Sequence, residues 1–144
     1  MADWKPKRTL VFNLSYGTDL YEELTKIVSE QQITRGRLSA IGATTHAIVA
    51  YYDQPTKKYN PLEFSGGMEI LNLQGNVSIR DGKPFVHAHI ILGDWDGKVF
   101  GGHLLPGTKL WACELFIDEF EGKELVRAHD EKTGLFLWKA ANPG

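Results

Sequence analysis

A two-residue turn near the middle of the chain, Asp81-Gly82, constrains the fold more than any other feature of the sequence. Asp-Gly is typical of the tight turn of a β-hairpin, because both residues tolerate the positive φ angles that this turn requires. The flanking segments, residues 68–80 and 85–92, are rich in apolar residues that alternate with polar residues or glycine. We predict two antiparallel strands here, and the short turn fixes which of their residues lie opposite one another.

In this register the two faces of the hairpin differ in chemistry. One face carries His87 opposite Asn76 and His89 opposite Gln74. The other face is entirely apolar, and its opposed pairs are Val77 with Val86, Gly75 with Ala88, Leu73 with Ile90 and Leu71 with Leu92. Burial stabilises a wholly apolar face, so we predict that it faces the core and that both histidines project from the opposite side.

A second reversal is predicted at residues 93–97, which read Gly-Asp-Trp-Asp-Gly. With these five residues as the loop, a third strand runs antiparallel to the second. His103 then lies opposite His87, and Gly101 lies opposite His89. A slip of one residue would turn His103 into the core, so the apolar pattern supports this alignment. All three histidines are therefore expected on one face of the sheet.

The three histidines, His87, His89 and His103, form a candidate metal site. Residues two apart on a strand point the same way, and opposed Cβ atoms lie about 4.5 to 5.5 Å apart, so the imidazoles can reach one ion. Neutral imidazoles suit zinc or another divalent transition metal and leave a position for water or a small ligand. Gly101 and Gly102 are expected to leave room beside the rings. The alternative is an ordinary half-exposed polar face, which is common for two histidines; the third favours the metal site.

Five other polar residues are candidates for a supporting role: Asn72, Gln74, Asn76, Glu69 and Glu114. The three amides share the histidine face and are expected to hydrogen-bond the metal ligands. A hydrolytic zinc site also needs a general base, and the two carboxylates are the candidates. Glu69 falls on the apolar face in this register, so a bulge or a subunit interface has to accommodate it. Glu114 shares a predicted face with apolar residues and needs a partner or an interface as well.

The remaining pattern predicts an α+β fold with a largely antiparallel sheet flanked by one or more helices. Residues 18–33 place apolar side chains on one helical stripe, and Thr18 or Asp19 is suited to cap the start of that helix. Further strands are predicted at residues 8–14, 37–41, 45–52, 98–105, 109–116, 125–128 and 135–138. The sequence contains no repeat and no linker, so residues 1–144 are expected to form a single domain.

Composition limits the partners and the compartment. A formal net charge of −2 and a pI near 6.2 lack the basic excess that drives binding to phosphate backbones. The apolar stretches are too short for a membrane-spanning helix, and the first ten residues lack the apolar core of a secretory signal. Cys113 is the only cysteine, so no intramolecular disulfide can form, and a reducing, cytoplasmic location is expected.

Four segments of the chain resemble, in order and spacing, the plant and prokaryote conserved (PPC) domain of stand-alone bacterial and archaeal proteins. They read GRLSAIGATTHAIVAYYD, GGMEILNLQGNVS, PFVHAHIILGDWDGKVFGGHLLPGT and ACELFIDEF. The same domain occurs in plant AT-hook nuclear proteins. The resemblance implies a PPC-like sheet flanked by helices and assembly as a homotrimer in which the sheet edges of neighbours meet. From some prokaryotic members it also implies a metal site, carried over to His87, His89 and His103.

These observations predict a trimeric metal-binding protein with a regulatory or ligand-binding role. One alternative is a DNA-binding regulatory protein, because relatives carry that label and Arg35-Gly36-Arg37 superficially resembles the core of an AT-hook. However, Leu38 stands where the hook has proline, and the net charge disfavours DNA. A second alternative is a zinc-dependent hydrolase or hydratase of unknown substrate, and the sequence leaves open whether any reaction is catalysed.

Overall fold

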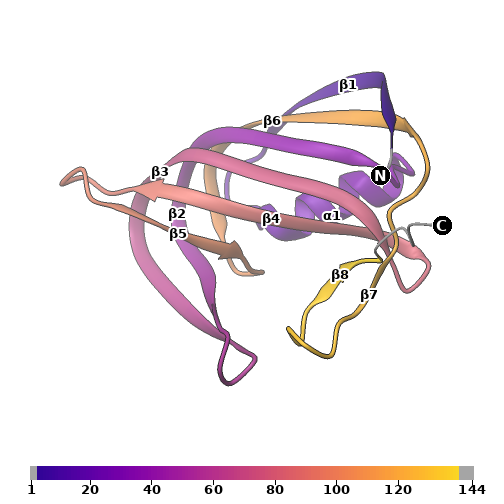
Figure 1. Cartoon of the computed structure of the whole chain (residues 1–144). Coiled ribbons are helices and arrows are strands. Elements are labelled where there is room, and N and C mark those ends of the chain that lie inside the picture. The colour runs from indigo at the N-terminus through magenta and orange to yellow at the C-terminus, as the bar shows by residue number, and fades with distance from the viewer. Residues whose placement is uncertain (1–2, 140–144) are drawn as a thin grey trace.

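The computed structural model describes residues 3–139, within which one helix packs against a curved antiparallel sheet (Figure 1). Six strands form this main sheet in the order β1-β6-β2-β3-β4-β5. They are β1 (Trp4–Leu14), β2 (Gly36–Asp53), β3 (Lys58–Arg80), β4 (Lys83–Gly93), β5 (Val99–Leu104) and β6 (Lys109–Gly122). A small second sheet pairs β7 (Arg127–His129) with β8 (Phe136–Trp138). The predicted α+β class with a largely antiparallel sheet is confirmed.

The helix α1 (Leu20–Glu30) forms where the apolar stripe was predicted, but it is shorter than residues 18–33 at both ends. Asp19 is extended and its side chain accepts a hydrogen bond from the backbone N–H of Glu22, which caps the first turn. Gln32 adopts a left-handed conformation with φ 55°, which ends the helix before Ile33. Among the described residues, no helix is long and apolar enough to cross a membrane.

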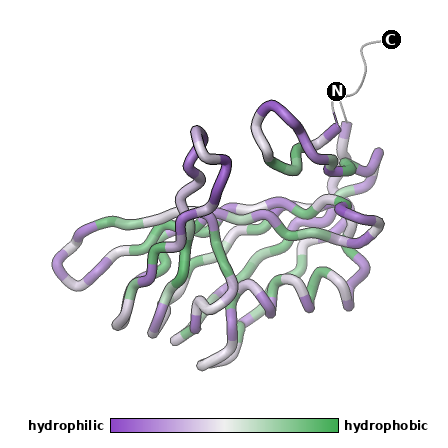
Figure 2. The backbone as a smooth tube through the Cα atoms, turned by 90° about the horizontal axis from the view of Figure 1, so that it is seen from below, coloured by the Kyte–Doolittle hydropathy of each residue, from purple (hydrophilic) through white to green (hydrophobic). Residues whose placement is uncertain are grey.

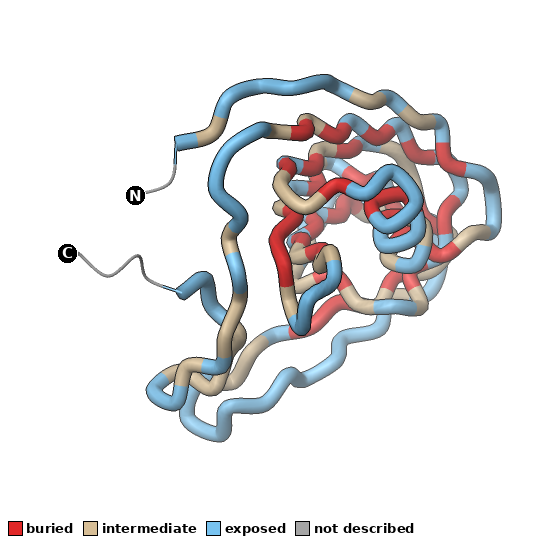
Figure 3. Tube along the Cα trace, turned by 90° about the vertical axis from the view of Figure 1, so that its right-hand side faces the viewer, coloured by how far each residue is buried: buried red, intermediate tan, exposed pale blue. Residues whose placement is uncertain are grey.

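The apolar face of the β3–β4 hairpin packs into the core, as predicted. Leu73, Val77 and Ile90 are almost completely buried, and they belong to one cluster with Leu20 and Leu24 of α1. Figure 3 shows the buried residues gathered around the helix and the strands beside it. Figure 2 shows α1 on one side of the sheet and the β7–β8 hairpin on the other. The face of β3 and β4 that lies away from the helix is therefore available for a site.

Strands β2 and β3 are longer than the sequence predicts. β2 joins the predicted segments 37–41 and 45–52 into one strand, and irregularities after Ala40 and Thr44 absorb the intervening residues. β3 begins at Lys58 rather than at Met68. The extra residues 58–67 are mostly exposed, so they show no alternation of buried and exposed positions and carry no strand signal in the sequence.

Strand β2 is long enough to pair with β6 in its first half and to reach β5, the strand that carries His103, in its second half. The first half of β2 pairs with β6, whereas Val49 and Ala50 pair with Leu104 and His103 of β5. β5 is therefore bonded to β4 on one side and to β2 on the other. This double pairing holds His103 on a strand that has neighbours along both edges.

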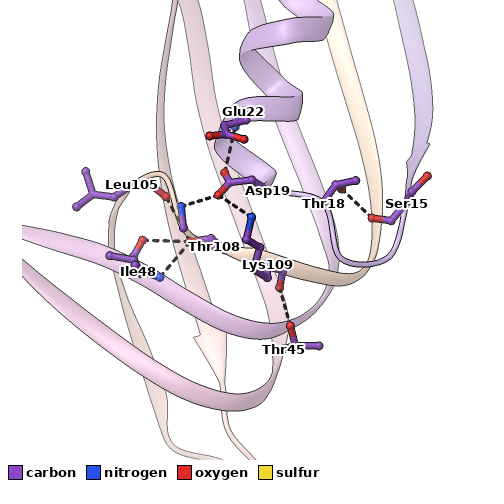
Figure 4. Close-up of polar contacts among 10 residues, drawn as sticks. Ser15, Thr18, Asp19, Glu22, Thr45, Ile48, Leu105, Thr108 and Lys109 are labelled. Atoms are coloured by element: carbon purple, nitrogen blue, oxygen red, sulfur yellow. Dashed lines mark hydrogen bonds and ion pairs between the residues drawn. The ribbon is translucent and has the colours of Figure 1, made fainter.

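A buried carboxylate, Asp19, ties the start of α1 to the turn that follows β5 (Figure 4). Its oxygens accept hydrogen bonds from the backbone N–H groups of Glu22 at 3.2 Å and Gly107 at 2.6 Å. The ammonium nitrogen of Lys109 lies 3.6 Å from the same side chain. Asp19 therefore satisfies the free end of the helix and closes the β5–β6 turn at once.

Thr108 links this turn to β2 (Figure 4). Its hydroxyl oxygen accepts a hydrogen bond from the backbone N–H of Ile48 and donates to the carbonyl oxygen of the same residue, both at 3.1 Å. The side chain of Thr108 is completely buried, so these bonds are shielded from water. The two contacts fix the end of β5 beside β2 and so help to position His103.

We expect the substitution Asp19→Ala to lower the free energy of unfolding by about 2 kcal/mol, because the backbone N–H groups of Glu22 and Gly107 lose their acceptor. Urea denaturation followed by circular dichroism measures this change. Glu30→Ala, an exposed acidic residue at the other end of α1, is the matched control and should change stability by less than about 0.5 kcal/mol. Equal effects of the two substitutions would contradict the role given to Asp19.

Candidate metal centre

The register of the β3–β4 hairpin agrees with the sequence prediction. Asp81 and Gly82 form the turn with φ angles of 51° and 75°, both positive as a two-residue hairpin requires. Asn76 lies opposite His87 and Gln74 lies opposite the next histidine, His89. Both imidazoles therefore project from the face that lies away from α1.

The predicted apolar pairing fails at one end of this hairpin, where β3 has a bulge between Ile70 and Asn72. Ile70, not Leu71, pairs with Leu92, and Leu71 is half exposed. The extra residue reverses which side chains point inward beyond it. As a result, Glu69 is exposed and does not lie on the apolar face.

The alignment of β5 differs from the prediction by two residues. His103 lies opposite His89, not opposite His87, because the loop occupies residues 94–98 and β4 and β5 are paired up to Gly93 and Val99. The side chain of Asp94 favours this loop, since its Oδ1 accepts hydrogen bonds from the backbone N–H groups of residues 96 and 98. A shift of two residues keeps every side chain on its predicted face, so the three histidines still converge.

The three imidazoles are close neighbours in space. The ring centroids lie 5.1 Å apart for His87 and His89, 5.0 Å for His87 and His103, and 5.4 Å for His89 and His103. One ring nitrogen from each residue lies within 4.8 Å of the other two. The Nδ1 atom of His103 is buried and has no hydrogen-bond partner among the described residues. These three residues could hold one metal ion.

Burial keeps two of the rings in the form that binds metal. Desolvation lowers the pKa of His87 to about 4, with smaller contributions from His103, Arg127 and His89. Desolvation likewise lowers the pKa of His103 to about 4, and His89 and Arg127 add to the effect. Both rings are therefore neutral at pH 7, and a neutral imidazole has the lone pair that a metal ion needs.

The two glycines of β5 leave room for backbone rather than for the histidine rings. A Cβ atom on Gly101 would lie 2.5 Å from the carbonyl oxygen of Ile90, and Gly101 faces Ile91 instead of His89. A Cβ atom on Gly102 would lie 2.8 Å from the carbonyl oxygen of Ala50. Gly102 thus permits the close approach of β2 and β5 and also lines the cavity beside the histidines.

Of the predicted supporting amides, one is linked to the histidines. The Oδ1 atom of Asn76 accepts a hydrogen bond of 2.9 Å from Arg127, which in turn reaches His87. Gln74 donates instead to the side chain of Asn72 at 3.2 Å. Gln74 and Asn72 therefore bond to each other on this face, and neither is bonded to an imidazole among the described residues.

The two predicted carboxylates lie elsewhere. Glu69 faces Gly93 at the far end of the hairpin and lines a separate cavity with Trp95 and Trp111. Glu114 is exposed on β6, opposite Ile41 of β2, and does not line the histidine cavity. Neither residue belongs to the group that could share a metal ion. The prediction that one of them acts as a general base finds no geometric support.

Two residues beside the histidines were missed by the sequence analysis. The Nη2 atom of Arg127 in β7 lies 3.5 Å from Nδ1 of His87, and the ring of Tyr59 in β3 lies 4.9 Å from that of His103, centroid to centroid. Tyr59 stands in the exposed part of β3 that had no strand signal, and Arg127 is 40 residues from His87 in sequence. Only the fold brings them together, so no local pattern could have indicated them.

The histidines line one end of a cavity of about 650 Å³, a volume typical of sites for small molecules. The β7–β8 hairpin forms a wall of this cavity and is anchored to the main sheet. The hydroxyl of Tyr52 donates to the carbonyl oxygen of Thr133 at 2.7 Å, and the ammonium of Lys57 donates to that of Glu131 at 2.7 Å. The site therefore combines a cluster of metal-binding side chains with an adjacent pocket.

We expect metal-free protein to lose stability as the pH falls from about 6.5 to about 4. In this window the unfolded chain protonates His87 and His103, while the folded protein keeps both rings neutral, so protons favour unfolding. Urea denaturation in the presence of a chelator, repeated at several pH values, measures the slope. The double variant His87→Asn/His103→Asn should show a flatter dependence, and an unchanged slope would contradict the assignment.

Comparison with known families gives one match that covers most of the chain. The family model of the Plants and Prokaryotes Conserved (PCC) domain matches residues 1–121. Residues 122–144, which include β7 and β8, lie beyond this match.

Solved structures of similar chains extend over nearly the whole sequence. A metal-containing protein from Archaeoglobus fulgidus is 42% identical, with a TM-score of 0.91 over 96% of this chain and 97% of that one. A plant- and prokaryote-conserved (PPC) protein from Pyrococcus horikoshii is 33% identical, with a TM-score of 0.90 over 95% and 94%. A candidate DNA-binding protein from Bacteroides thetaiotaomicron is 26% identical, with a TM-score of 0.85 over 96% of each chain.

Two curated relatives are much longer proteins. The bifunctional protein GlmU of Synechococcus sp. strain JA-3-3Ab is 33% identical over 129 residues, which are 88% of this chain and 20% of GlmU. GlmU of a second Synechococcus strain is 32% identical over 120 residues, or 18% of its length. The chain thus spans about a fifth of the length of the curated relatives that it matches.

Proposed function

Because the chain belongs to the Plants and Prokaryotes Conserved (PCC) domain family, we propose that it is a metal-binding protein in which His87, His89 and His103 hold zinc or another divalent transition metal. Its role is to bind a ligand at that metal and to act as a regulatory protein, rather than to catalyse a reaction. The proposal treats residues 1–144 as one domain in the cytoplasm, and the buried, unpaired thiol of Cys113 agrees with that location.

The observation that carries this proposal is the convergence of three imidazoles, two of which burial keeps neutral; among the described residues, one of these two also has a buried nitrogen without a hydrogen-bond partner. An unsatisfied buried polar atom destabilises a folded protein, and a metal ion bound to Nδ1 of His103 would remove that penalty. The ligand set consists of nitrogen donors from neighbouring strands, which suits zinc and similar metals better than calcium or magnesium. The similar protein from Archaeoglobus fulgidus is described as metal-containing, which supports the same reading.

When bound, such a metal supplies an open coordination position where a water molecule or an anionic ligand can attach. The chain's own residues determine what reaches that position. Arg127 and Asn76 hold each other beside His87, and Tyr59 packs against His103. Because neither Glu69 nor Glu114 lies at the site, the structure offers no support for either as the base of a hydrolase or hydratase.

We expect protein purified without a histidine tag to contain about one equivalent of a divalent transition metal per chain. The triple variant His87→Ala/His89→Ala/His103→Ala should contain almost none, because all of the proposed ligands are removed. Elemental analysis by mass spectrometry measures the content.

A matched control removes the two other histidines of the chain, His46 and His129, which interact with Glu63 and Glu131 rather than with the cluster. The variant His46→Ala/His129→Ala should keep the full metal content. Equal metal content in the wild type and the triple variant would show that the cluster is only a polar patch.

We also propose that the protein assembles as a homotrimer. The face of the sheet away from α1 exposes large apolar side chains beyond the histidine cavity, including Val11, Ile41, Trp111 and Phe116, which are 46–63% exposed. Val11 lies directly opposite Phe116, and neighbouring exposed apolar side chains are typical of protein interfaces. Strand β1 also has an unpaired edge in the order of the main sheet. Both features agree with contacts between neighbouring sheets.

We expect sedimentation equilibrium to give a mass near that of three 16.2 kDa chains. Ile41→Glu should lower the mass towards that of one chain, because a charge replaces an apolar side chain at the proposed interface. Its circular dichroism spectrum should match that of the wild type, since Ile41 does not belong to the buried core. A wild-type protein that sediments as a single chain would contradict the trimer.

DNA binding is the alternative that one comparison favours, since the similar chain from Bacteroides thetaiotaomicron is described as a candidate DNA-binding protein. The charges of this chain argue against it. The net charge is −2, and Arg37, in the segment that resembles an AT-hook core, is paired with Asp118 at 2.7 Å. Its neighbour Arg35 interacts with Glu124 and with a backbone carbonyl oxygen. Both arginines are thus paired with acidic side chains, so we prefer the metal-binding role.

A further inference from the structure

The walls of the histidine cavity carry cationic side chains and, among the described residues, no acidic one. Three of the lining residues are cationic: Lys57, Arg80 and Arg127. None of the described residues that line the cavity is Asp or Glu. Arg80 pairs with the exposed Asp81 outside the cavity, but Arg127 forms no ion pair among the described residues. A metal ion at the histidines would add further positive charge.

Arg127 is the unusual member of this group, because a half-buried guanidinium is held only by neutral acceptors. Its Nε donates to the hydroxyl of Ser78 at 2.8 Å, and its Nη1 donates to the carbonyl oxygen of Phe136 at 2.9 Å. Its Nη2 donates to the side chain of Asn76 at 2.9 Å. These bonds fix the orientation of the guanidinium without neutralising it. A charge in such a place is costly unless an anion accompanies it.

The remaining contact of Arg127 depends on whether the histidines hold a metal. Its Nη2 also lies 3.5 Å from Nδ1 of His87. A neutral imidazole has a single lone pair, and an imidazole that binds a metal has used that lone pair. His87 then cannot accept a hydrogen bond from Arg127 at either ring nitrogen. The N–H group that faces His87 consequently needs another acceptor.

The rest of the cavity is apolar and aromatic. Phe85, Phe136, Leu135 and Leu137 line it together with Tyr59. The guanidinium of Arg80 lies 3.6 Å above the centre of the Phe136 ring, which screens this aromatic wall from solvent. A ligand that fits the cavity therefore needs an acidic group beside the histidines and Arg127 and an apolar body that contacts the phenylalanine and leucine side chains.

We propose that the cavity binds a small organic acid with an apolar or aromatic body, whose carboxylate lies between the metal at the three histidines and the guanidinium of Arg127. This inference rests on the proposed metal-binding function, because the metal is one of the two groups that bind the carboxylate. The planar guanidinium and the metal both favour a carboxylate, and the absence of acidic side chains from the lining removes any competitor. Arg127 is a binding residue here and sets the charge of the ligand.

Arg127 lies in a part of the chain, the β7–β8 hairpin, that can determine which ligand this site binds. The family match ends at residue 121, whereas Arg127 and three apolar lining residues, Leu135, Phe136 and Leu137, belong to the β7–β8 hairpin or border it. The three histidines lie inside the match. Substitutions in the hairpin can therefore change which acid is bound without changing the metal ligands.

The test is the binding of benzoate to zinc-loaded protein by isothermal titration calorimetry, compared with benzamide. Benzamide has the same shape and no charge, so we expect it to bind at least about tenfold more weakly than benzoate. The variant Arg127→Gln, brought to the same zinc content, should lose at least about tenfold in benzoate affinity, and its affinity for benzamide should hardly change. Arg127→Lys keeps the positive charge but loses the planar pair of N–H donors, so its affinity for benzoate should lie between those of the wild type and Arg127→Gln.

Arg37→Gln is the matched control, since it removes an arginine of the main sheet that does not line the cavity and should leave benzoate binding unchanged. Equal affinity for benzoate and benzamide in the wild type, or full benzoate affinity in Arg127→Gln, would overturn the proposal. The wild-type comparison needs no variant, so it decides the question even if Arg127→Gln fails to fold. Metal content is measured separately: a wild type that holds zinc but prefers benzamide refutes this inference alone, whereas a wild type that binds no divalent transition metal refutes the proposed function.

Discussion

The pairing of β3 with β4 across the Asp81-Gly82 turn is the constraint on which the rest of the structure depends. Because side chains alternate along a strand, one register assigns every residue of both strands to a face. It places Leu73, Val77 and Ile90 under α1 and, by the same geometry, His87 and His89 on the opposite side. The core and the candidate site thus lie on opposite faces of one hairpin, and a shift of the register by one residue would disrupt both.

The sequence predicted this part of the fold because its signals are local. The turn chemistry of Asp81-Gly82 and the alternation around it need no information from distant residues. The loop between β4 and β5 was predicted at residues 93–97 but occupies residues 94–98. The glycine pattern allows either position, and the hydrogen bonds accepted by the side chain of Asp94 favour the observed one. The error of two residues in the pairing of His103 left its face unchanged, which is why the cluster was still predicted correctly.

What the sequence could not predict depends on contacts between distant segments or on bulges. The bulge after Ile70 moves Glu69 to the exposed surface; a carboxylate on the apolar face indicated that a bulge or an interface was needed, but the sequence pattern did not say which, or where the extra residue lies. The exposed start of β3 has no alternation, so Tyr59 was not placed beside His103. Arg127 reaches the site only because its hairpin folds over the sheet. The functional surroundings of the histidines were therefore harder to predict than the histidines themselves.

The two faces of the sheet have different roles, and this difference explains how the chain can place several cationic side chains beside the histidines. Stability comes from the apolar face, where Leu20, Leu24 and Leu38 pack without any exposed surface. The opposite face does not have to be apolar, and it keeps neutral imidazoles beside an arginine whose partners are all uncharged. Such an arrangement costs free energy when empty, because the guanidinium is desolvated without a counter-ion. An anionic ligand offsets that cost, so the same feature that weakens the empty protein favours the bound one.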